Sequence, residues 1–302
     1  MIIKVGTRGS KLALAQTNYV IDRLKQAFPE NEYEVVIIKT TGDKDQTRPL
    51  DQIGSKGLFV DEIERALLAD EIQLAVHSMK DMPSDQPEGL VFAKAWDRED
   101  PRDVLILKNG NKLSDLPQGA NVATGSKRRS YQLLALRPDI NIFPIRGNID
   151  TRIKKLHEGL ADETELDGII LAAAGLKRLH IESDNYYFFD FDEMIPSPAQ
   201  GTLALELNKS NTKLLEMVNS LSSDESEDFA FLERGFLQKI DGDCHLPIGA
   251  IASKTNEGYN LKALFGDEDG KHLARVSVNG AKADESLIDL AIREINKQLE
   301  NS

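Results

Sequence analysis

Residues 122–136 read VATGSKRRSYQLLAL: a short apolar run, a glycine-containing turn and then a helical pattern of apolar residues. A strand that turns directly into a helix is the repeating unit of α/β folds. The unit recurs at once, because the sequence predicts strands at 140–145 and 168–172 and helices at 148–160 and 173–179. This part of the chain is therefore predicted to form an α/β domain.

The same alternation precedes this stretch. The predicted strands lie at 2–5, 33–39 and 74–77, and the predicted helices at 11–28 and 59–69. Strands and helices that alternate at this spacing predict a largely parallel sheet, with ligands bound beyond the carboxyl ends of its strands. Lys80 and Asp81 follow such a strand end. The polar residues 40–57 lack periodicity and are predicted to form a mobile functional loop.

Two proline-bearing segments are interpreted as breaks: 99–103 is the first crossing between domains and separates the two α/β series, and 196–201 precedes a smaller series. One strand is predicted at 202–207, and the rest of the chain comprises helices at 224–238 and 284–299 and strands at 248–253, 259–265 and 274–278. Three strands flanked by two helices predict a small C-terminal α/β domain.

Composition restricts the class of protein. The chain has 302 residues and a net charge of −13, which argues against a general nucleic-acid binder but allows a local basic cleft. Its single cysteine and the early polar residues at its start predict a reducing, cytoplasmic setting without a signal peptide. No apolar run approaches the roughly 20 residues that a membrane span needs, so no membrane partner is expected.

Arginines mark two helix starts. The helix dipole attracts anions to the first turn, so Arg128 and Arg129 there predict an anionic ligand between them. Arg146 and Arg152 follow the next strand in the same way. Surface salt bridges of Arg129 and Arg152 are the alternative. Two strand ends that both deliver arginines nevertheless favour a cleft for a ligand with several carboxylates.

A third such turn lies near the N-terminus. Ser10 is expected to cap the helix 11–28 and to leave two backbone N–H groups for an anion, with Arg8 just before the helix. A plain N-cap is the simpler interpretation of Ser10, and the two roles are compatible.

The chain's one cysteine lies in Gly242-Asp243-Cys244-His245-Leu246-Pro247-Ile248-Gly249. A lone cysteine excludes an internal disulfide and a cysteine-built zinc site, which leaves a buried inert thiol, a nucleophile or an attachment point. Buried thiols are common, but the glycine, proline and polar neighbours indicate a loop. The local pattern therefore favours a functional thiol.

The segment 242–249 resembles the cofactor-attachment loop of the porphobilinogen deaminase family, with Asp243 where glycine is usual. Further matches follow in order along nearly the whole chain, and departures occur at Gly125, Lys127 and Ala199, the last at a position where glycine is usual. The matching segments are TRGS at 7–10, KGLF at 56–59, VHSMKD at 76–81, TGSKRR at 124–129, RGN at 146–148, AGLKRL at 174–179 and PAQG at 198–201.

The resemblance implies an enzyme, a transferase that condenses four porphobilinogen molecules into hydroxymethylbilane and releases ammonia at each addition. A dipyrromethane bound covalently to Cys244 through a thioether serves as primer. The resemblance also implies two doubly wound mixed-sheet domains like the halves of periplasmic binding proteins, plus a small C-terminal α/β domain. The predicted domains span 1–98 with 197–218, 101–194, and 221–302.

The resemblance also implies a role for each residue of this chain that lies at a matching position of the family's motifs. Asp81 and Lys80 are the implied catalytic residues, and no metal is expected; a monomer with no nucleic-acid partner is expected. The implied cofactor-binding residues are Cys244, Lys80, Asp81, Ser78, Thr124, Ser126, Arg128, Arg129, Arg146 and Gly147. The implied substrate-binding residues are Arg8, Ser10, Arg146, Arg152, Phe59 and Gln200, and Lys56 belongs to the lid.

Two other classes of function remain open on the residues themselves. One is a two-domain protein that binds a small anion without catalysis, for which an export signal would be expected. The other is a hydrolase that uses Cys244 with His245 as its base. Adjacent residues of an extended chain point in opposite directions, so that pair is poorly placed.

Overall fold

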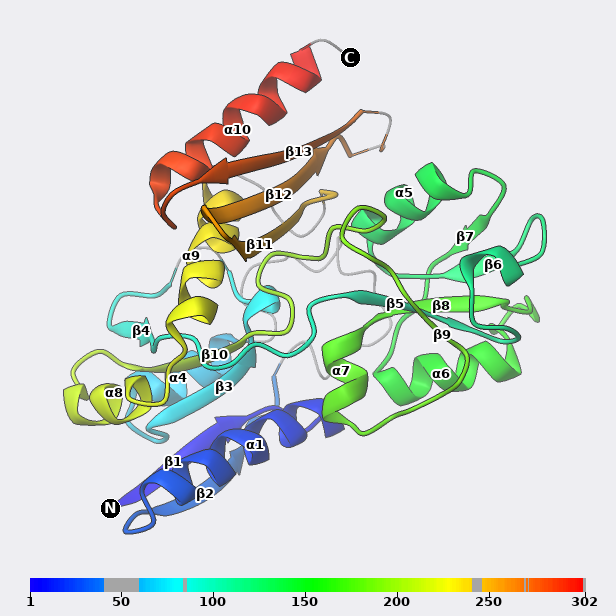
Figure 1. Ribbon diagram of the computed structural model, residues 1–302. Helices are drawn as coiled ribbons and strands as arrows, with labels where there is room; N and C mark the ends of the chain where they lie inside the picture. The colour runs from blue at the N-terminus through cyan, green and yellow to red at the C-terminus, as the bar shows by residue number, and fades with distance from the viewer. Residues whose placement is uncertain (41–59, 84–85, 241–245, 269, 271, 301–302) are drawn as a thin grey trace. The chain divides into compact units, whose positions relative to one another are not determined.

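The computed structural model describes residues 1–40, 60–83, 86–240, 246–268, 270 and 272–300 (Figure 1). The chain forms two compact units. Unit 1 comprises Met1–Glu99 and Gly201–Asp228, and unit 2 comprises Asp100–Gln200 and Phe229–Ser302. Unit 1 holds one five-stranded sheet, and unit 2 holds a second five-stranded sheet and a three-stranded sheet. The predicted α/β fold class with mixed sheets is confirmed.

The first sheet has the order β2-β1-β3-β10-β4. β1 pairs in parallel with β2 and β3, whereas β10 is antiparallel to both β3 and β4. Only β10 therefore runs against the others, and it enters the sheet after the chain returns from unit 2. The strands are β1 (Ile2–Thr7), β2 (Glu32–Ile37), β3 (Leu74–Ser78), β4 (Leu90–Phe92) and β10 (Leu203–Asn208).

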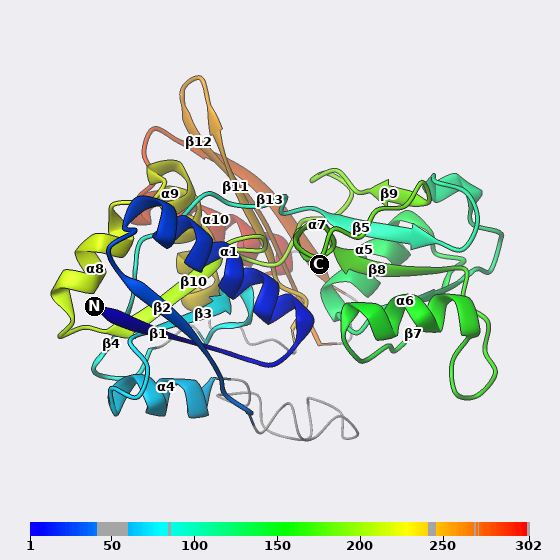
Figure 2. The same ribbon diagram turned by 90° about the horizontal axis from the view of Figure 1, so that it is seen from below.

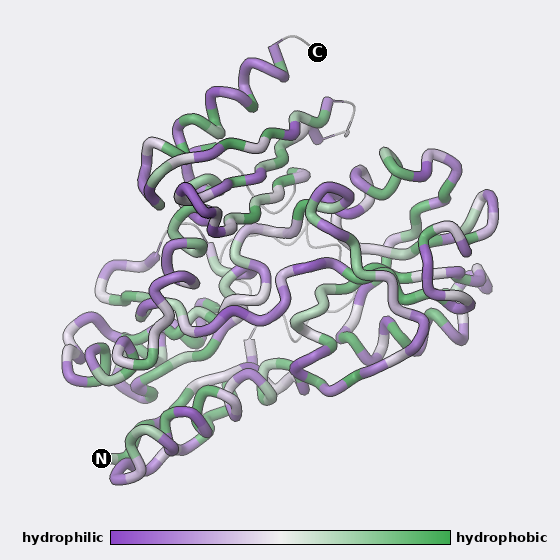
Figure 3. Tube along the Cα trace, viewed as in Figure 1, coloured by the Kyte–Doolittle hydropathy of each residue, from purple (hydrophilic) through white to green (hydrophobic). Residues whose placement is uncertain are grey.

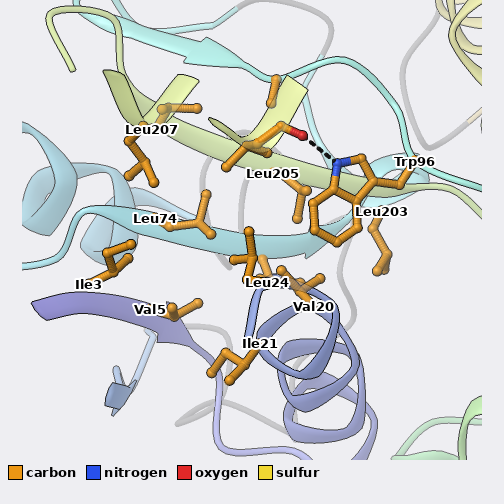
Figure 4. Close-up of a cluster of buried hydrophobic side chains, with 14 residues drawn as sticks. Ile3, Val5, Val20, Ile21, Leu24, Leu74, Trp96, Leu203, Leu205 and Leu207 are labelled. Carbon is orange, nitrogen blue, oxygen red and sulfur yellow. Dashed lines mark hydrogen bonds between the residues drawn. The ribbon is translucent and has the colours of Figure 1, made fainter. Parts of the chain in front are cut away.

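Helices cover both faces of this sheet, because successive residues of β3 point to opposite sides. Leu74 and Val76 pack with α1 (Lys11–Ala27) and α8 (Thr212–Asn219), whereas Ala75 packs with α4 (Asp61–Leu68). Figure 2 shows α1 and α4 on either side of the strands. Figure 4 shows the core beneath α1, where Trp96 donates its indole N–H to the carbonyl of Val218 at 2.9 Å.

The second sheet repeats this arrangement, with the order β7-β6-β8-β5-β9. β6 is parallel to β7 and β8, and β5 is antiparallel to β8 and β9. Leu133 of α5 (Lys127–Leu136) packs on one face, and α6 (Ile149–Glu158) and α7 (Ala173–Arg178) pack on the other. The strands are β5 (Asp103–Leu107), β6 (Asn121–Ala123), β7 (Asn141–Phe143), β8 (Gly168–Ala172) and β9 (Tyr186–Phe188).

The third sheet is an antiparallel meander of β11 (Gly249–Thr255), β12 (Gly258–Gly266) and β13 (Leu273–Gly280). α9 (Asp224–Lys239) and α10 (Glu285–Glu300) supply Phe236 and Ile288 to its core. Figure 3 shows hydrophilic and hydrophobic residues alternating along α10, as expected for a helix with one face on a sheet. Among the helices of the described residues, none is long and apolar enough to cross a membrane.

Some elements were not anticipated from the sequence: β4, β5, β9 and α8. The segment 99–103 was interpreted as a break between domains, but β5 begins at its last residue, Asp103. An aspartate rarely opens a fully buried strand unless it is paired. The division into three domains stays a prediction. In its favour, the strands of each sheet fall into one of the three predicted ranges.

A buried group of ionisable side chains lies between α4 and the first sheet. Glu64, His77 and Glu206 are 9%, 7% and 0% exposed. His77 Nε2 lies 3.3 Å from Glu206 Oε2, yet neither atom makes a hydrogen bond in the described part of the chain. Burial, followed by the negative charges of Glu206 and Asp61, raises the pKa of Glu64 to about 7.

We expect this raised pKa to make stability fall with pH. Between the ordinary carboxyl pKa of 4.5 and about 7, the folded chain holds a proton that the unfolded chain releases. Stability is thus lost as pH rises across this window and levels off above it. Glu64→Gln should be about 2–3 kcal/mol more stable than the parent at pH 8 and no different at pH 4.5, measured by urea unfolding. The exposed Glu71→Gln is the control, and equal pH profiles for the two variants would contradict the prediction.

Candidate active site

In unit 1, the predicted site residues gather at one edge of the first sheet. β1 and β3 are parallel neighbours, so their carboxyl ends meet at the same edge. Arg8 and Ser10 follow β1, whereas Ser78, Lys80 and Asp81 end or follow β3. The residues that the sequence placed on separate motifs are therefore brought together on this edge.

Hydrogen bonds fix the two turns of this edge. Ser10 caps α1 by accepting the backbone N–H of Ala13 at 3.2 Å, as predicted. Gln16, on the same helix, donates its amide to the Ser78 hydroxyl at 3.0 Å. Helix α1 is thereby tied to the end of β3, and the two turns keep one arrangement.

Asp81 lies on a short 3-10 turn, Met79–Asp81, that continues β3. The turn is anchored because Met79 is buried and donates its backbone N–H to the carbonyl of Thr202 at 3.0 Å. Lys80 is half-buried and Asp81 is exposed. The turn thus holds the Asp81 carboxylate at the sheet edge, accessible to a ligand.

In unit 2, α5 begins just before Arg128 and Arg129, so both arginines lie in its first turn as predicted. Ser126 is the N-cap and accepts the N–H of Arg129 at 3.5 Å, while the Thr124 hydroxyl accepts the N–H of Ser126 at 3.3 Å. These bonds set the direction in which the first helical turn leaves the sheet. Arg128 and Arg129 lie on that turn.

Both arginines bind one carboxylate, that of Asp103 at the start of β5. Arg128 Nη1 lies 2.6 Å from Asp103 Oδ2, and Arg129 Nη2 lies 2.7 Å from Oδ1. Asp103 is fully buried, and the arginines are 5% and 6% exposed. The alternative of a surface salt bridge is therefore wrong for Arg129. No pattern in the sequence indicated Asp103 as their partner.

This arginine cluster, Asp103 with Arg128 and Arg129, carries a surplus positive charge. Burial raises the pKa of Asp103, but the attraction of the two guanidinium groups outweighs that effect and keeps its pKa below the usual range. One carboxylate then faces two arginines, which stay charged in proteins. A buried charge is costly unless it is paired, so the cluster favours a further anion from a ligand.

Gln200, predicted to bind substrate, lies on this cluster. It is fully buried, and its amide nitrogen is 2.9 Å from Asp103 Oδ1 and 2.8 Å from the carbonyl of Pro101. Its neighbour Ala199 has a φ of +58°, the left-handed region that favours glycine. That conformation accounts for the glycine usual at this position.

The turn after β7 carries the remaining basic residues of unit 2. Gly147 has a φ of +112°, and a Cβ there would lie 2.8 Å from the Thr151 side chain, so the turn requires glycine. Arg152 Nε donates to the carbonyl of Gly147 at 2.8 Å, and both Arg152 and Arg146 are half-buried. Because β6 and β7 are parallel, this turn and the start of α5 share one edge of the second sheet.

Cys244, Phe59 and Lys56 lie outside the described residues, so the attachment point, the stacking residue and the lid stay predictions. The described site residues form two sets, one at the carboxyl edge of the parallel strands in each unit. This arrangement defines an α/β protein with basic side chains at the carboxyl edges of the parallel strands in each unit.

Comparison with known proteins shows which family the chain belongs to. The family model "Porphobilinogen deaminase, dipyromethane cofactor binding domain" matches residues 3–216, and "Porphobilinogen deaminase, C-terminal domain" matches 229–295. The chain belongs to the porphobilinogen deaminase family. The porphobilinogen deaminase of Lachnospira eligens is 52% identical over 94% of this chain and 96% of its own length. That of Clostridium novyi is 48% identical over 98% and 100%.

Among solved structures, an ancestral cationic amino acid solute binding protein is similar, with a TM-score of 0.44 and 16% identity over 73% of this chain and 87% of that one. This likeness is too low to carry an argument about function. The identification therefore rests on the family models and the curated relatives.

We expect Asp103 to be essential for the stability of unit 2. Asp103→Asn leaves two buried guanidinium groups without a counter-charge, which should cost about 3–5 kcal/mol of unfolding free energy at pH 7. The control is Glu165→Gln, which breaks an exposed pair with Lys108 and should cost under about 0.5 kcal/mol. Because the pKa of Asp103 is depressed, the parent should lose this advantage as pH falls through that low value. Urea unfolding measures both, and equal losses in the two variants would refute the assignment.

Proposed function

We propose that the chain catalyses the stepwise condensation of four porphobilinogen molecules into hydroxymethylbilane, with release of ammonia, on a covalently bound dipyrromethane primer. The proposal rests mainly on the buried arginine cluster. The chain belongs to the porphobilinogen deaminase family and has a net charge of −13, so these buried positive charges contrast with its overall charge. Each porphobilinogen has one acetate and one propionate, so each addition brings two negative charges. Buried arginines in an otherwise acidic protein suit such a ligand.

The residues present fit the dipyrromethane cofactor. Its carboxylates match the surplus charge of the arginine cluster, together with Lys80, Arg146 and the N-terminal turn of α5. When bound, the dipyrromethane supplies the pyrrole carbon from which the product grows. Thr124, Ser126 and Gly147 shape the turns on which these groups are held, and Ser78 supports the turn of Lys80.

Cys244 is the proposed attachment point. It is the only cysteine of the chain, and a thiolate is the strong nucleophile needed to form a thioether with an electrophilic methylene group. Once the sulfur is alkylated it no longer acts as a nucleophile and serves as an anchor.

Asp81 is the proposed catalytic carboxylate, with Lys80 beside it. Loss of ammonia from porphobilinogen places positive charge on the pyrrole nitrogen, and a carboxylate next to the pyrrole N–H stabilises that charge and orients the ring. The exposed Asp81 at the anchored end of β3 is accessible for this contact. Arg8 and Arg152 are assigned to the incoming substrate or the lengthening product, with Ser10, Phe59 and Gln200 in support. Lys56 is assigned to the lid.

We further propose that the enzyme acts as a monomer in the cytoplasm and binds no nucleic acid. The high negative charge of the chain supports the last point.

The first test is the intact mass of the purified protein. It should exceed the sequence mass by two linked pyrrole units, and Cys244→Ser should remove the excess because no other thiol is available. Active protein with an unmodified, alkylatable Cys244 would overturn the proposed attachment.

The second test separates catalysis from ligand binding. Asp81→Ala should reduce porphobilinogen consumption at least about 100-fold, the size of effect expected when a group that stabilises developing charge is removed. Its circular dichroism should be unchanged. Asp22→Ala, an exposed aspartate on α1 of the same unit, is the matched control and should consume porphobilinogen at the parent rate. Near-normal porphobilinogen consumption by Asp81→Ala would contradict a catalytic role for Asp81 and leave it a structural one.

A further inference from the structure

Glu233 of α9 is a fully buried carboxylate for which the proposed reaction gives no role. Its Oε1 accepts the backbone N–H of Ala252 on β11 at 2.8 Å. Its Oε2 accepts the backbone N–H of Ala199 at 2.6 Å. The residue therefore joins the sheet of the C-terminal region to the segment 195–200 within unit 2.

The segment 195–200 is in turn held against the arginine cluster. Arg128 Nη1 donates to the carbonyl of Ile195 at 2.7 Å, and the Gln132 side chain exchanges two hydrogen bonds with the backbone of Ile195. At the other end of the segment, Gln200 donates to Asp103 Oδ1 at 2.9 Å. A continuous hydrogen-bonded connection thus runs from α9 through Ala199 and Gln200 to the carboxylate shared by the two arginines.

Ala199 is the strained point of this connection. Its φ of +58° disfavours any residue with a Cβ by roughly 1–2 kcal/mol. A short hydrogen bond from its N–H to a buried carboxylate is among the stronger kinds of hydrogen bond. The bond to Glu233 therefore offsets the strain and fixes the direction in which Gln200 points.

We propose that Glu233 is a positioning residue: it holds Ala199 in the left-handed conformation and so sets Gln200, Asp103 and the arginine pair for the carboxylates of the cofactor. The proposal rests on the proposed function, because it assigns those carboxylates to Arg128 and Arg129. The proposal also gives the C-terminal region a second role, besides carrying the attachment point. Helix α9 ends at Lys239, five residues before Cys244, so the element that leads to the attachment point also orders the arginine cluster.

The test compares the parent and four variants by intact mass as isolated. Glu233→Gln keeps the size of the side chain but places an NH2 group against one of two backbone N–H donors. We expect the ratio of cofactor-loaded to unloaded protein to fall about tenfold, the effect of losing one charge-assisted hydrogen bond. Adding Ala199→Gly to Glu233→Gln should restore most of the loading, because glycine adopts the positive φ without help.

Two further variants separate positioning from stability. Ile295→Ala opens the core of the third sheet and lowers the unfolding midpoint without touching the segment 195–200, so it should keep full loading. Gln200→Met breaks the connection beyond Glu233 and should lose loading even if Glu233→Gln fails to fold.

The inference is overturned if Glu233→Gln and Gln200→Met both load as fully as the parent. It is also overturned if Ile295→Ala loses the cofactor to the same extent, or if Ala199→Gly gives no recovery in a folded double variant. A parent protein without the two-pyrrole mass would instead contradict the proposed function, so the two failures are distinguishable.

Discussion

The structure of unit 2 depends on one carboxylate, Asp103, buried between two guanidinium groups. Removing any member of such a group leaves an uncompensated charge in a dry environment, so its members constrain one another. The start of β5, the first turn of α5 and the segment 195–200 are fixed by this requirement as much as by apolar packing. This group has a net positive charge, because two guanidinium groups share one carboxylate. In the proposed function, the same three side chains serve both stability and ligand affinity.

Distribution of charge explains how an acidic chain can hold an anionic product. The cationic groups proposed for binding are placed by strand ends and helix starts, where backbone N–H groups point the same way. Acidic residues elsewhere keep the net charge at −13. Local geometry, rather than overall charge, therefore determines the sign of the potential that a ligand meets in each unit.

The sequence predicted much of this arrangement, because strand-turn-helix units have a recognisable periodicity, and Ser10 was predicted correctly as the cap of α1. It failed where the determinant is distant in sequence. Asp103 pairs with residues 25 and 26 positions later, and the amide of Gln200 reaches it from 97 positions away. β4 and β9 have three residues each, too few for a period to show. Buried polar partners carry no local signature, so only the fold reveals them.

The two five-stranded sheets have the same pattern of strand directions, and in each the fourth strand across the sheet alone runs against the rest. In the second sheet that strand, β5, comes first, and all five strands lie within residues 103–188. In the first sheet it is β10, at 203–208, which is also the partner of β4. During synthesis the second sheet can therefore be completed while the first still has a gap beside β3. The first sheet therefore cannot be completed until β10, made about 110 residues after β4, is available, so its completion depends on a contact far more distant in sequence.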